Sequence, residues 1–155
     1  MLLAGLCLLP WESVAQSAGA TDQTDTTESP RYVTQQWTVA DGLPVNAVSD
    51  VTQTEDGYLW LATFDGLVRF DGAQFTVYQS GNHDGLPSSR ILDVEAVGQV
   101  VWLRTESQHL VRMARGTFQT IALPNVLTLH VTDDQTVWAG TGDGLFRVEA
   151  TGSAT

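Results

Sequence analysis

Aspartate followed by glycine is the most frequent pattern of chemical interest in this sequence. Six such pairs begin at Asp41, Asp56, Asp65, Asp71, Asp84 and Asp143. Calcium loops also combine carboxylates with glycine, but they need several oxygen ligands at fixed short spacing and a later Glu. That spacing does not occur here, whereas glycine allows the positive φ of a hairpin turn. The pairs therefore predict tight turns, and no metal site is expected.

Histidine and serine supply the other groups that could bind a metal or attack a substrate. The histidines are His83, His109 and His130. They are expected in three separate places, and no His or Cys spacing matches a zinc site. Ser88 and Ser89 lie outside any Gly-x-Ser-x-Gly motif. The acids Asp133-Asp134 fit a solvated turn better than general acid–base work. The sequence thus predicts no catalytic residue and no cofactor.

Three tryptophans recur at nearly constant spacing with similar neighbours. Trp60 lies 42 positions before Trp102, which lies 36 positions before Trp138. Periods near 40 residues with one tryptophan per unit are typical of the four-stranded blades of a β-propeller. Sugar stacking is the alternative role for these rings, but recurrence at one place in every unit favours packing between blades.

The first unit shows how such a blade would be built. Strands are expected over residues 47–54, 58–63, 67–70 and 74–79, with Asp-Gly turns between them. The second of these is apolar at nearly every residue, so both of its faces are expected to be buried. The fourth alternates polar and apolar residues, as a strand at the outer rim does. This gradient favours a radial blade over a flat sandwich.

The other units are less complete. In the second, residues 106–108 (Glu-Ser-Gln) replace a glycine turn, so a looser loop is expected. The third unit ends after its third strand, because residues 150–155 hold no aromatic outer strand. Tyr32 to Val39 precedes the marker Gly42-Leu43-Pro44, as an outer strand precedes Gly85-Leu86-Pro87. The predicted fold is all-β: a β-propeller fragment with two full four-stranded blades, a partial third blade and an orphan N-terminal outer strand.

Composition argues against two classes of partner. The net charge is −11 and lysine is absent. The seven basic residues are scattered singly: Arg31, Arg69, Arg90, Arg104, Arg112, Arg115 and Arg147. Nucleic-acid binding needs a basic stripe, and docking to anionic lipid needs a polybasic cluster. We therefore expect no nucleic acid and no lipid surface among the direct partners.

The beginning of the chain differs in composition from the rest. Residues 1–20 hold a short apolar run followed by small-x-small patterns, which predicts a secretory signal peptide. No basic residue precedes the apolar run, and a start codon upstream of Met1 would account for this. Residues 21–31 are polar and predict a disordered linker. Residues 32–155 are left as the partial propeller.

The repeat units resemble the two-component regulator propeller repeat. The resemblance rests on residues 41–46, 56–60, 65–67, 69–72, 75–78 and 140–145. In that family the repeats form periplasmic sensor regions of bacterial signalling proteins, commonly hybrid histidine kinases or diguanylate cyclases. The resemblance implies a membrane-anchored, dimeric parent protein with its output domain elsewhere. Because closed propellers have roughly four to eight blades, further blades are expected as partners of this segment.

The leader and the resemblance together predict an extracytoplasmic, periplasmic ligand-sensing segment that is not itself an enzyme. A secreted propeller that only binds a protein or a glycan is the alternative. Ligands of propellers more often contact loops at one end of the central channel. The candidates there are Asn46, His83, Ser88 and Arg90, and the expected ligand is a small molecule or a glycan.

Overall fold

The structure is a computed structural model that describes residues 32–132 and 134–149. The signal peptide expected over residues 1–20 and the linker expected over 21–31 lie outside the described residues. The chain divides into two compact units, Met1–Thr34 and Gln35–Thr155. The strands and clusters below all belong to the second unit. No helix in the described part of the chain is long and apolar enough to cross a membrane.

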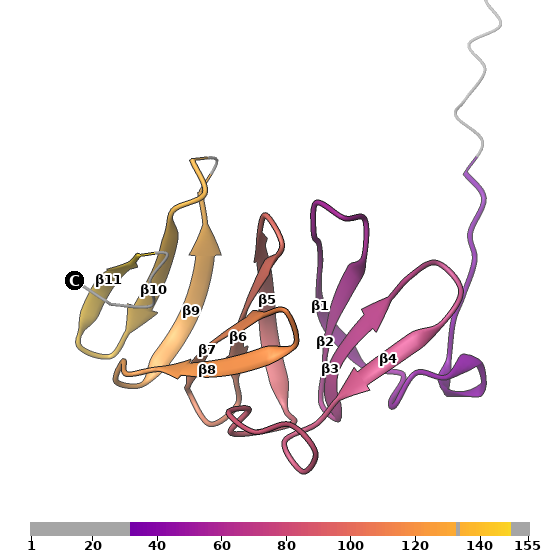
Figure 1. Cartoon of the computed structure of the whole chain (residues 1–155), viewed down its shortest axis with the longest axis horizontal. Coiled ribbons are helices and arrows are strands. Elements are labelled where there is room, and N and C mark those ends of the chain that lie inside the picture. The colour runs from indigo at the N-terminus through magenta and orange to yellow at the C-terminus, as the bar shows by residue number, and fades with distance from the viewer. Residues whose placement is uncertain (1–31, 133, 150–155) are drawn as a thin grey trace, which may run out of the picture. The chain divides into compact units, whose positions relative to one another are not determined.

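The second unit consists of antiparallel sheets that follow one another in chain order (Figure 1). The first sheet contains β1 (Val48–Gln53), β2 (Leu59–Thr63), β3 (Gly66–Phe70) and β4 (Phe75–Tyr78). The second contains β5 (Ile91–Val97), β6 (Val100–Thr105), β7 (Leu110–Ala114) and β8 (Thr117–Ile121). The third contains β9 (Val126–Val131), β10 (Val137–Thr141) and β11 (Gly144–Val148). Two four-stranded blades and a partial third are thereby confirmed.

The first strand of each sheet lies next to the first strand of its neighbour, because β5 contacts both β1 and β9. These three strands share a local irregularity. The register shifts by one residue between Val48 and Asp50 in β1, and between Ile91 and Asp93 in β5. The third sheet has the shift at the equivalent place, where β10 meets β9. A bulge of this kind bends a strand and re-aims its side chains.

Tryptophan side chains fill the space between successive sheets. Trp60 of β2 is 6% exposed and packs in one cluster with Val101 and Met113 of the second sheet. Trp102 of β6 is 2% exposed and packs in another cluster with Val137 of the third sheet. Burying one such ring is worth on the order of 4 to 6 kcal/mol. The predicted packing between blades is confirmed for both rings.

The third tryptophan differs from the other two. Trp138 occupies the equivalent place on β10 but is only half-buried. Each tryptophan lies opposite an arginine of the neighbouring strand, in the pairs Trp60–Arg69, Trp102–Arg112 and Trp138–Arg147. Because Trp60 and Trp102 face the following sheet, Trp138 is on a face that no described sheet covers.

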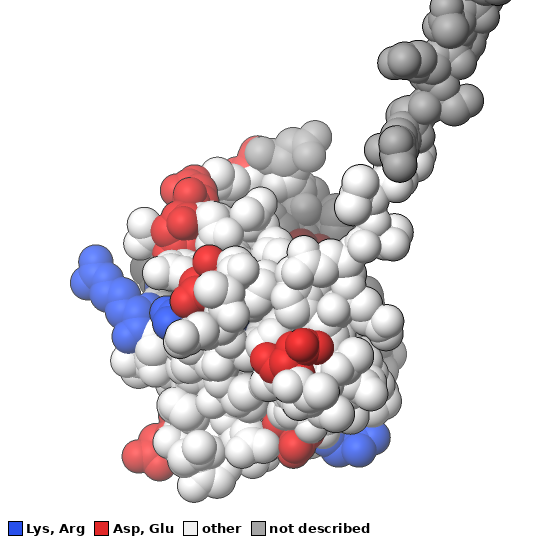
Figure 2. Space-filling view, turned by 90° about the vertical axis from the view of Figure 1, so that its right-hand side faces the viewer, with Lys and Arg blue, Asp and Glu red and all other residues white. Residues whose placement is uncertain are grey.

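The first sheet also has an uncovered face. An apolar groove of about 220 Å³ lies there, lined by Trp37, Leu43, Val48, Leu59, Leu61, Phe70 and Phe75. The ring of Trp37 meets that of Phe70 edge-on, with centroids 5.2 Å apart. Viewed from the side of the first sheet, most of the surface is uncharged (Figure 2). Both outer sheets therefore present apolar side chains where a neighbouring blade would pack.

The segment before the first sheet departs from the expectation. An outer strand was expected over Tyr32 to Val39, but residues 32–38 form no strand. Val39–Asp41 form a short 3₁₀ helix, η1, which the side chain of Thr38 caps. An extended segment becomes a strand only by pairing, and none of the described strands pairs with this one.

The turn over residues 106–108 also departs from the expectation. A loose loop was expected because glycine is absent. The structure has a tight turn instead, in which the Gln108 N–H donates to the Thr105 carbonyl at 2.9 Å. Gln108 itself adopts the positive φ, at 63°. A polar residue can thus replace glycine when the turn hydrogen bonds are kept, at a conformational cost.

The Gly-Leu-Pro marker has a steric explanation. Gly85 has a φ of +84°, and a Cβ placed on it would lie 2.4 Å from the Phe118 carbonyl oxygen of β8. Thr120 of the same strand donates to the Gly85 carbonyl at 3.1 Å. Leu86, which follows, is buried in the cluster between the first two sheets. The marker therefore fastens the connection leaving the first sheet to the outer strand of the second.

We predict that Gly85→Ala destabilises the propeller more than Gly72→Ala does. Both glycines have positive φ, but nothing lies within 4 Å of a Cβ at Gly72. Gly72→Ala should therefore cost only the backbone term of roughly 1 to 2 kcal/mol. Gly85→Ala should add an overlap cost of about 1 to 3 kcal/mol. Urea unfolding of the full-length protein measures both, and equal losses would refute the steric explanation.

We also predict that the 155-residue chain alone is poorly stable, because its two outer sheets expose apolar faces and Leu145 is 69% exposed. Such faces associate or unfold unless they are covered. Differential scanning calorimetry with size-exclusion chromatography should show association or a broad transition. A sharp, cooperative transition of a monomer would contradict this expectation.

Candidate functional site

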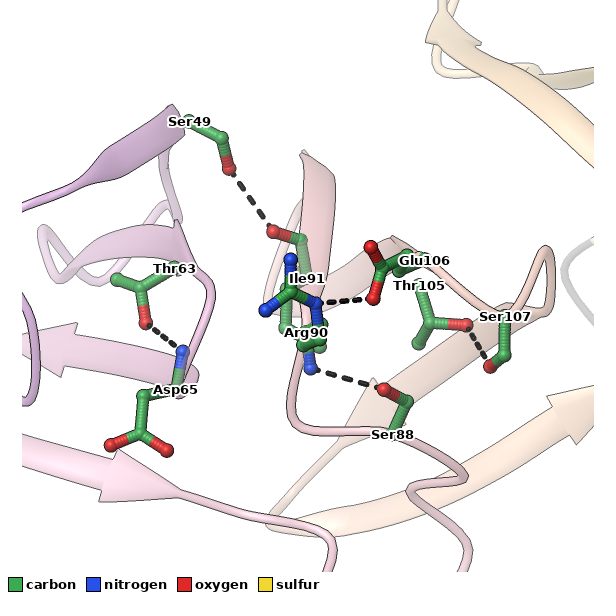
Figure 3. Close-up of polar contacts among 9 residues, drawn as sticks. All are labelled: Ser49, Thr63, Asp65, Ser88, Arg90, Ile91, Thr105, Glu106 and Ser107. Carbon is green, nitrogen blue, oxygen red and sulfur yellow. Dashed lines mark hydrogen bonds and ion pairs between the residues drawn. The ribbon is translucent and has the colours of Figure 1, made fainter.

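Two of the four predicted ligand candidates lie together at one end of the second sheet. Ser88 and Arg90 immediately precede β5, and the turn at Glu106 lies beside them (Figure 3). The Ser88 hydroxyl oxygen accepts a hydrogen bond from the Arg90 N–H at 3.1 Å. The Glu106 N–H donates to the Arg90 carbonyl at 2.8 Å. The backbone around Arg90 is therefore fixed on both sides.

The side chain of Arg90 joins the first sheet to the second. Its Nε atom forms an ion pair with the carboxylate of Glu106, drawn in Figure 3. Its guanidinium carbon lies 4.7 Å from the centre of the Phe64 ring, in the β2–β3 turn. Arg90 and Glu106 are each about half exposed, so a ligand can still reach them. A guanidinium stacked on a ring and paired with one acid keeps further N–H donors available.

A threonine hydroxyl shapes each neighbouring turn at this end. The Thr63 hydroxyl donates to the Gly66 carbonyl at 2.7 Å and accepts from the Asp65 N–H at 3.2 Å. The same two bonds recur at Thr141 in the third sheet. Thr105 occupies the equivalent place in the second sheet, and its side chain is fully buried. These hydroxyls hold the turns in one conformation, so the site is largely preformed.

Polar side chains of β1 link the first two sheets. The hydroxyl of Ser49, which lies in the bulge, is 3.1 Å from the carbonyl oxygens of Ala62 and Ile91, so these two acceptors share its single proton. Ile91 belongs to the next sheet, and its contact with Ser49 is drawn in Figure 3. A carboxylate oxygen of Asp50 accepts from the Val94 N–H of β5 at 2.9 Å. Among the described strands, β5 pairs only with β6. Asp50 therefore satisfies a backbone donor on the free edge of β5.

The other two predicted candidates do not join Ser88 and Arg90. The Asn46 side-chain oxygen accepts from the Val39 N–H at 2.9 Å and so holds η1 against the connection to β1. The His83 ring packs against Tyr78 and Phe118, with centroids 4.9 and 5.8 Å away. Its Nδ1 is buried and has no hydrogen-bond partner among the described residues. Their role as ligand contacts stays a prediction.

Sequence reasoning missed a group of titratable residues on the inner strands. Asp50, Asp93 and Glu95 lie on β1 and β5, and His130 lies on β9 with its Nδ1 3.9 Å from Glu95. Asp93 is paired with Arg104. Burial raises the pKa of Glu95, the charge of Asp50 raises it further, and His130 opposes both. Asp50 and Asp93 occupy equivalent positions on the first strands of two repeat units, and this repetition was the signal in the sequence that could have revealed the group.

The aspartates of the Asp-Gly pairs act inside their turns. A carboxylate oxygen of Asp71 accepts from the N–H groups of Ala73 and Gln74, and these bonds lower the pKa of Asp71. Asp56 accepts from the Thr54 hydroxyl at 2.6 Å. The turn interpretation is thereby supported. Within residues 32–132 and 134–149, no three His, Cys, Asp or Glu side chains are grouped as metal ligands would be.

Sequence comparison connects the first blade with bacterial signalling proteins. Residues 42–65, which end at the β2–β3 turn, match the Two component regulator propeller family. Over 57 residues the chain is 37% identical to Histidine kinase P4 of Formosa agariphila. That match covers 37% of this chain and 4% of the kinase, so the chain spans a small part of this relative.

Structural comparison matches most of the chain. An extracellular domain assigned to a hybrid two-component system of B. thetaiotaomicron has a TM-score of 0.62 and 22% identity, covering 73% of this chain and 17% of that one. A second such domain from this organism has a TM-score of 0.60 and 25% identity, covering 71% and 16%. Virginiamycin B lyase of Staphylococcus aureus has a TM-score of 0.58 and 19% identity, covering 74% and 42%.

These findings define the class of the protein. Four-stranded antiparallel sheets that pack face to face in chain order, with solved propeller domains as structural neighbours, make it a β-propeller segment. More particularly, residues 42–65 match the two-component regulator propeller repeat. The likeness to the lyase concerns the fold alone, and one fold can carry unrelated functions.

We predict opposite pH dependences for Glu95→Gln and Asp71→Asn. The pKa of Glu95 is raised above 4.5, so its charge destabilises the folded state above the folded pKa and this penalty disappears as the pH falls. Glu95→Gln should therefore raise the unfolding midpoint more at pH 7 than at pH 4. The pKa of Asp71 is lowered, so its charge stabilises the folded state at pH 7 and less in acid.

Asp71→Asn is thus the matched control, with a destabilising effect that should shrink as the pH falls through the folded pKa of Asp71. Thermal unfolding of the full-length protein, followed by tryptophan fluorescence, measures both variants at pH 7 and pH 4, and Asp71→Asn also in stronger acid, because its folded pKa lies below 3.8. An effect of Glu95→Gln that is the same at pH 4 and pH 7 would contradict the assignment.

Proposed function

We propose that the chain is part of an extracytoplasmic, periplasmic ligand-sensing propeller of a bacterial transmembrane signalling protein. The observation that carries this proposal is the regulator propeller repeat at residues 42–65, seated in a blade whose structural neighbours are extracellular domains of two-component systems. The match to a histidine kinase supports the same class. The chain itself has a binding role, and the output domain belongs to the parent protein.

The site at the start of β5 is the proposed place of ligand contact. Arg90 touches Phe64 of the first sheet and Glu106 of the second, so a ligand that binds Arg90 acts on the boundary between two blades. A ligand shifts an equilibrium only by its difference in affinity between two states. A small molecule or glycan that binds more tightly to one arrangement of the two blades would then shift the conformational equilibrium of the dimeric, membrane-anchored parent protein.

The remaining blades of the parent are the proposed intramolecular partners. The groove at Trp37 and Phe70 on the first sheet is apolar, and Trp138 and Leu145 on the third sheet are incompletely buried. In a closed ring the two faces are covered by neighbouring blades, as the Trp60 and Trp102 faces are within this chain. This accounts for the apolar groove on the first sheet and for the incomplete burial of Trp138 and Leu145 on the third.

We predict that the gene encodes a membrane span and a kinase or cyclase domain after the propeller. Alkaline phosphatase, which is active only after export, should be active when fused after Glu149, and a cytoplasmically folding reporter should be dark there. An inactive phosphatase with a bright reporter would overturn the extracytoplasmic assignment. An active phosphatase in a gene with no membrane span and no output domain would favour a secreted binding module.

A further inference from the structure

We propose that a cleft between the first and second sheets binds a small hydroxylated acid through two arginines. The cleft has a volume of about 310 Å³, at the lower end of the usual range for small-molecule sites. Its lining includes Asp56, Tyr58, Trp60, Arg69, Gln99 and Arg115. Four of them belong to the first sheet and its β1–β2 turn, and two come from turns of the second sheet.

This cleft is separate from the site at Arg90. Asp56 lies in the β1–β2 turn, Gln99 in the β5–β6 turn and Arg115 in the β7–β8 turn. Arg90 lies where the chain enters β5, and Glu106 lies in the β6–β7 turn. Since successive turns of a meander alternate between its two ends, the cleft opens at the end of the blades away from Arg90.

The two arginines of the cleft are the reason to expect an anion. Arg90, Arg104 and Arg147 each form an ion pair with a carboxylate. The guanidiniums of Arg69 and Arg115 form no ion pair or hydrogen bond among the described residues, although the chain has a net charge of −11 and the charge of Arg69 helps to lower the pKa of Asp71. Two such guanidiniums from different sheets therefore meet in one cleft. A guanidinium binds carboxylate, sulfate or phosphate oxygens through paired N–H donors.

Arg69 is held in place for this role. Its guanidinium carbon lies 4.6 Å from the centre of the Tyr58 ring. It is half-buried on the middle strand β3, directly opposite Trp60. The Trp60 indole N–H is already used, because it donates to the Thr54 hydroxyl at 3.0 Å. Stacking on a rigid strand reduces the entropy that Arg69 would lose when an anion binds.

Asp56 and Gln99 define the rest of the ligand. One carboxylate oxygen of Asp56 accepts from the Thr54 hydroxyl, which fixes the carboxylate inside its turn. A carboxylate beside two arginines accepts hydrogen bonds from hydroxyl groups, and the Gln99 amide can donate or accept. The lining therefore fits an acid that also carries hydroxyls better than a bare hydrophobic anion. Such a ligand would bridge two blades.

The proposal deepens the sensing role and rests on it for its biological meaning, but binding is measured without any signalling output. Isothermal titration of the full-length protein should show saturable binding of sodium gluconate, and weaker binding of sodium sulfate. Sorbitol, which has the hydroxyls of gluconate but no charge, should not bind. Arg69→Gln and Arg115→Asn should each weaken gluconate binding at least tenfold. Asn tolerates the positive φ of 51° at position 115.

Arg147→Gln is the matched control, because Arg147 lies opposite Trp138 as Arg69 lies opposite Trp60, but outside the cleft. It should leave binding unchanged, and circular dichroism should show that all three variants are folded. Absence of saturable binding for both anions, or unchanged binding in folded Arg69→Gln and Arg115→Asn, overturns the site. If either result comes with active phosphatase and an encoded output domain, only this site fails and the sensing role stands.

Discussion

The structure depends on the burial of one broad face of each sheet against the next sheet. Trp60 and Trp102 stand at equivalent places, and each is buried in a cluster that includes residues of the following blade. A single sheet of this sequence has no way to cover both of its faces. The repeat is therefore a consequence of packing: every unit supplies an aromatic side chain to one neighbour and small or branched side chains to the other. Trp138 keeps the same place without a described neighbour.

The same boundaries that stabilise the fold carry the polar chemistry. Ser49 and Asp50 hydrogen-bond to β5 across the first boundary, and Arg90 joins two blades at one end. The cleft with Arg69 and Arg115 opens on this boundary at the other end. Strand pairing holds each blade together internally, so motion between blades breaks fewer hydrogen bonds than motion within a blade. A ligand on a blade boundary is therefore well placed to select one arrangement of the ring.

Much of the fold could be predicted from the sequence, because it depends on local turn chemistry and on tryptophan spacing. Asp71 illustrates the turns, because its carboxylate accepts hydrogen bonds from the backbone N–H groups of Ala73 and Gln74, two and three residues further along the chain. Pairing and packing across blades were harder to predict. Residues 32–38 were expected to be a strand, but a strand needs a partner that local sequence does not reveal. Gln108 adopts a positive φ that its residue type does not indicate. The Glu95–His130 contact joins two sheets and carries no local motif.

An experimental structure of the full-length protein tests the central claim most directly, through the surroundings of Trp138. The account predicts that a further four-stranded sheet covers this ring, with apolar side chains against it as Val101 and Met113 lie against Trp60. A Trp138 ring open to solvent, or packed against a helix or a loop, would contradict the claim that these sheets are stacked through their tryptophan faces.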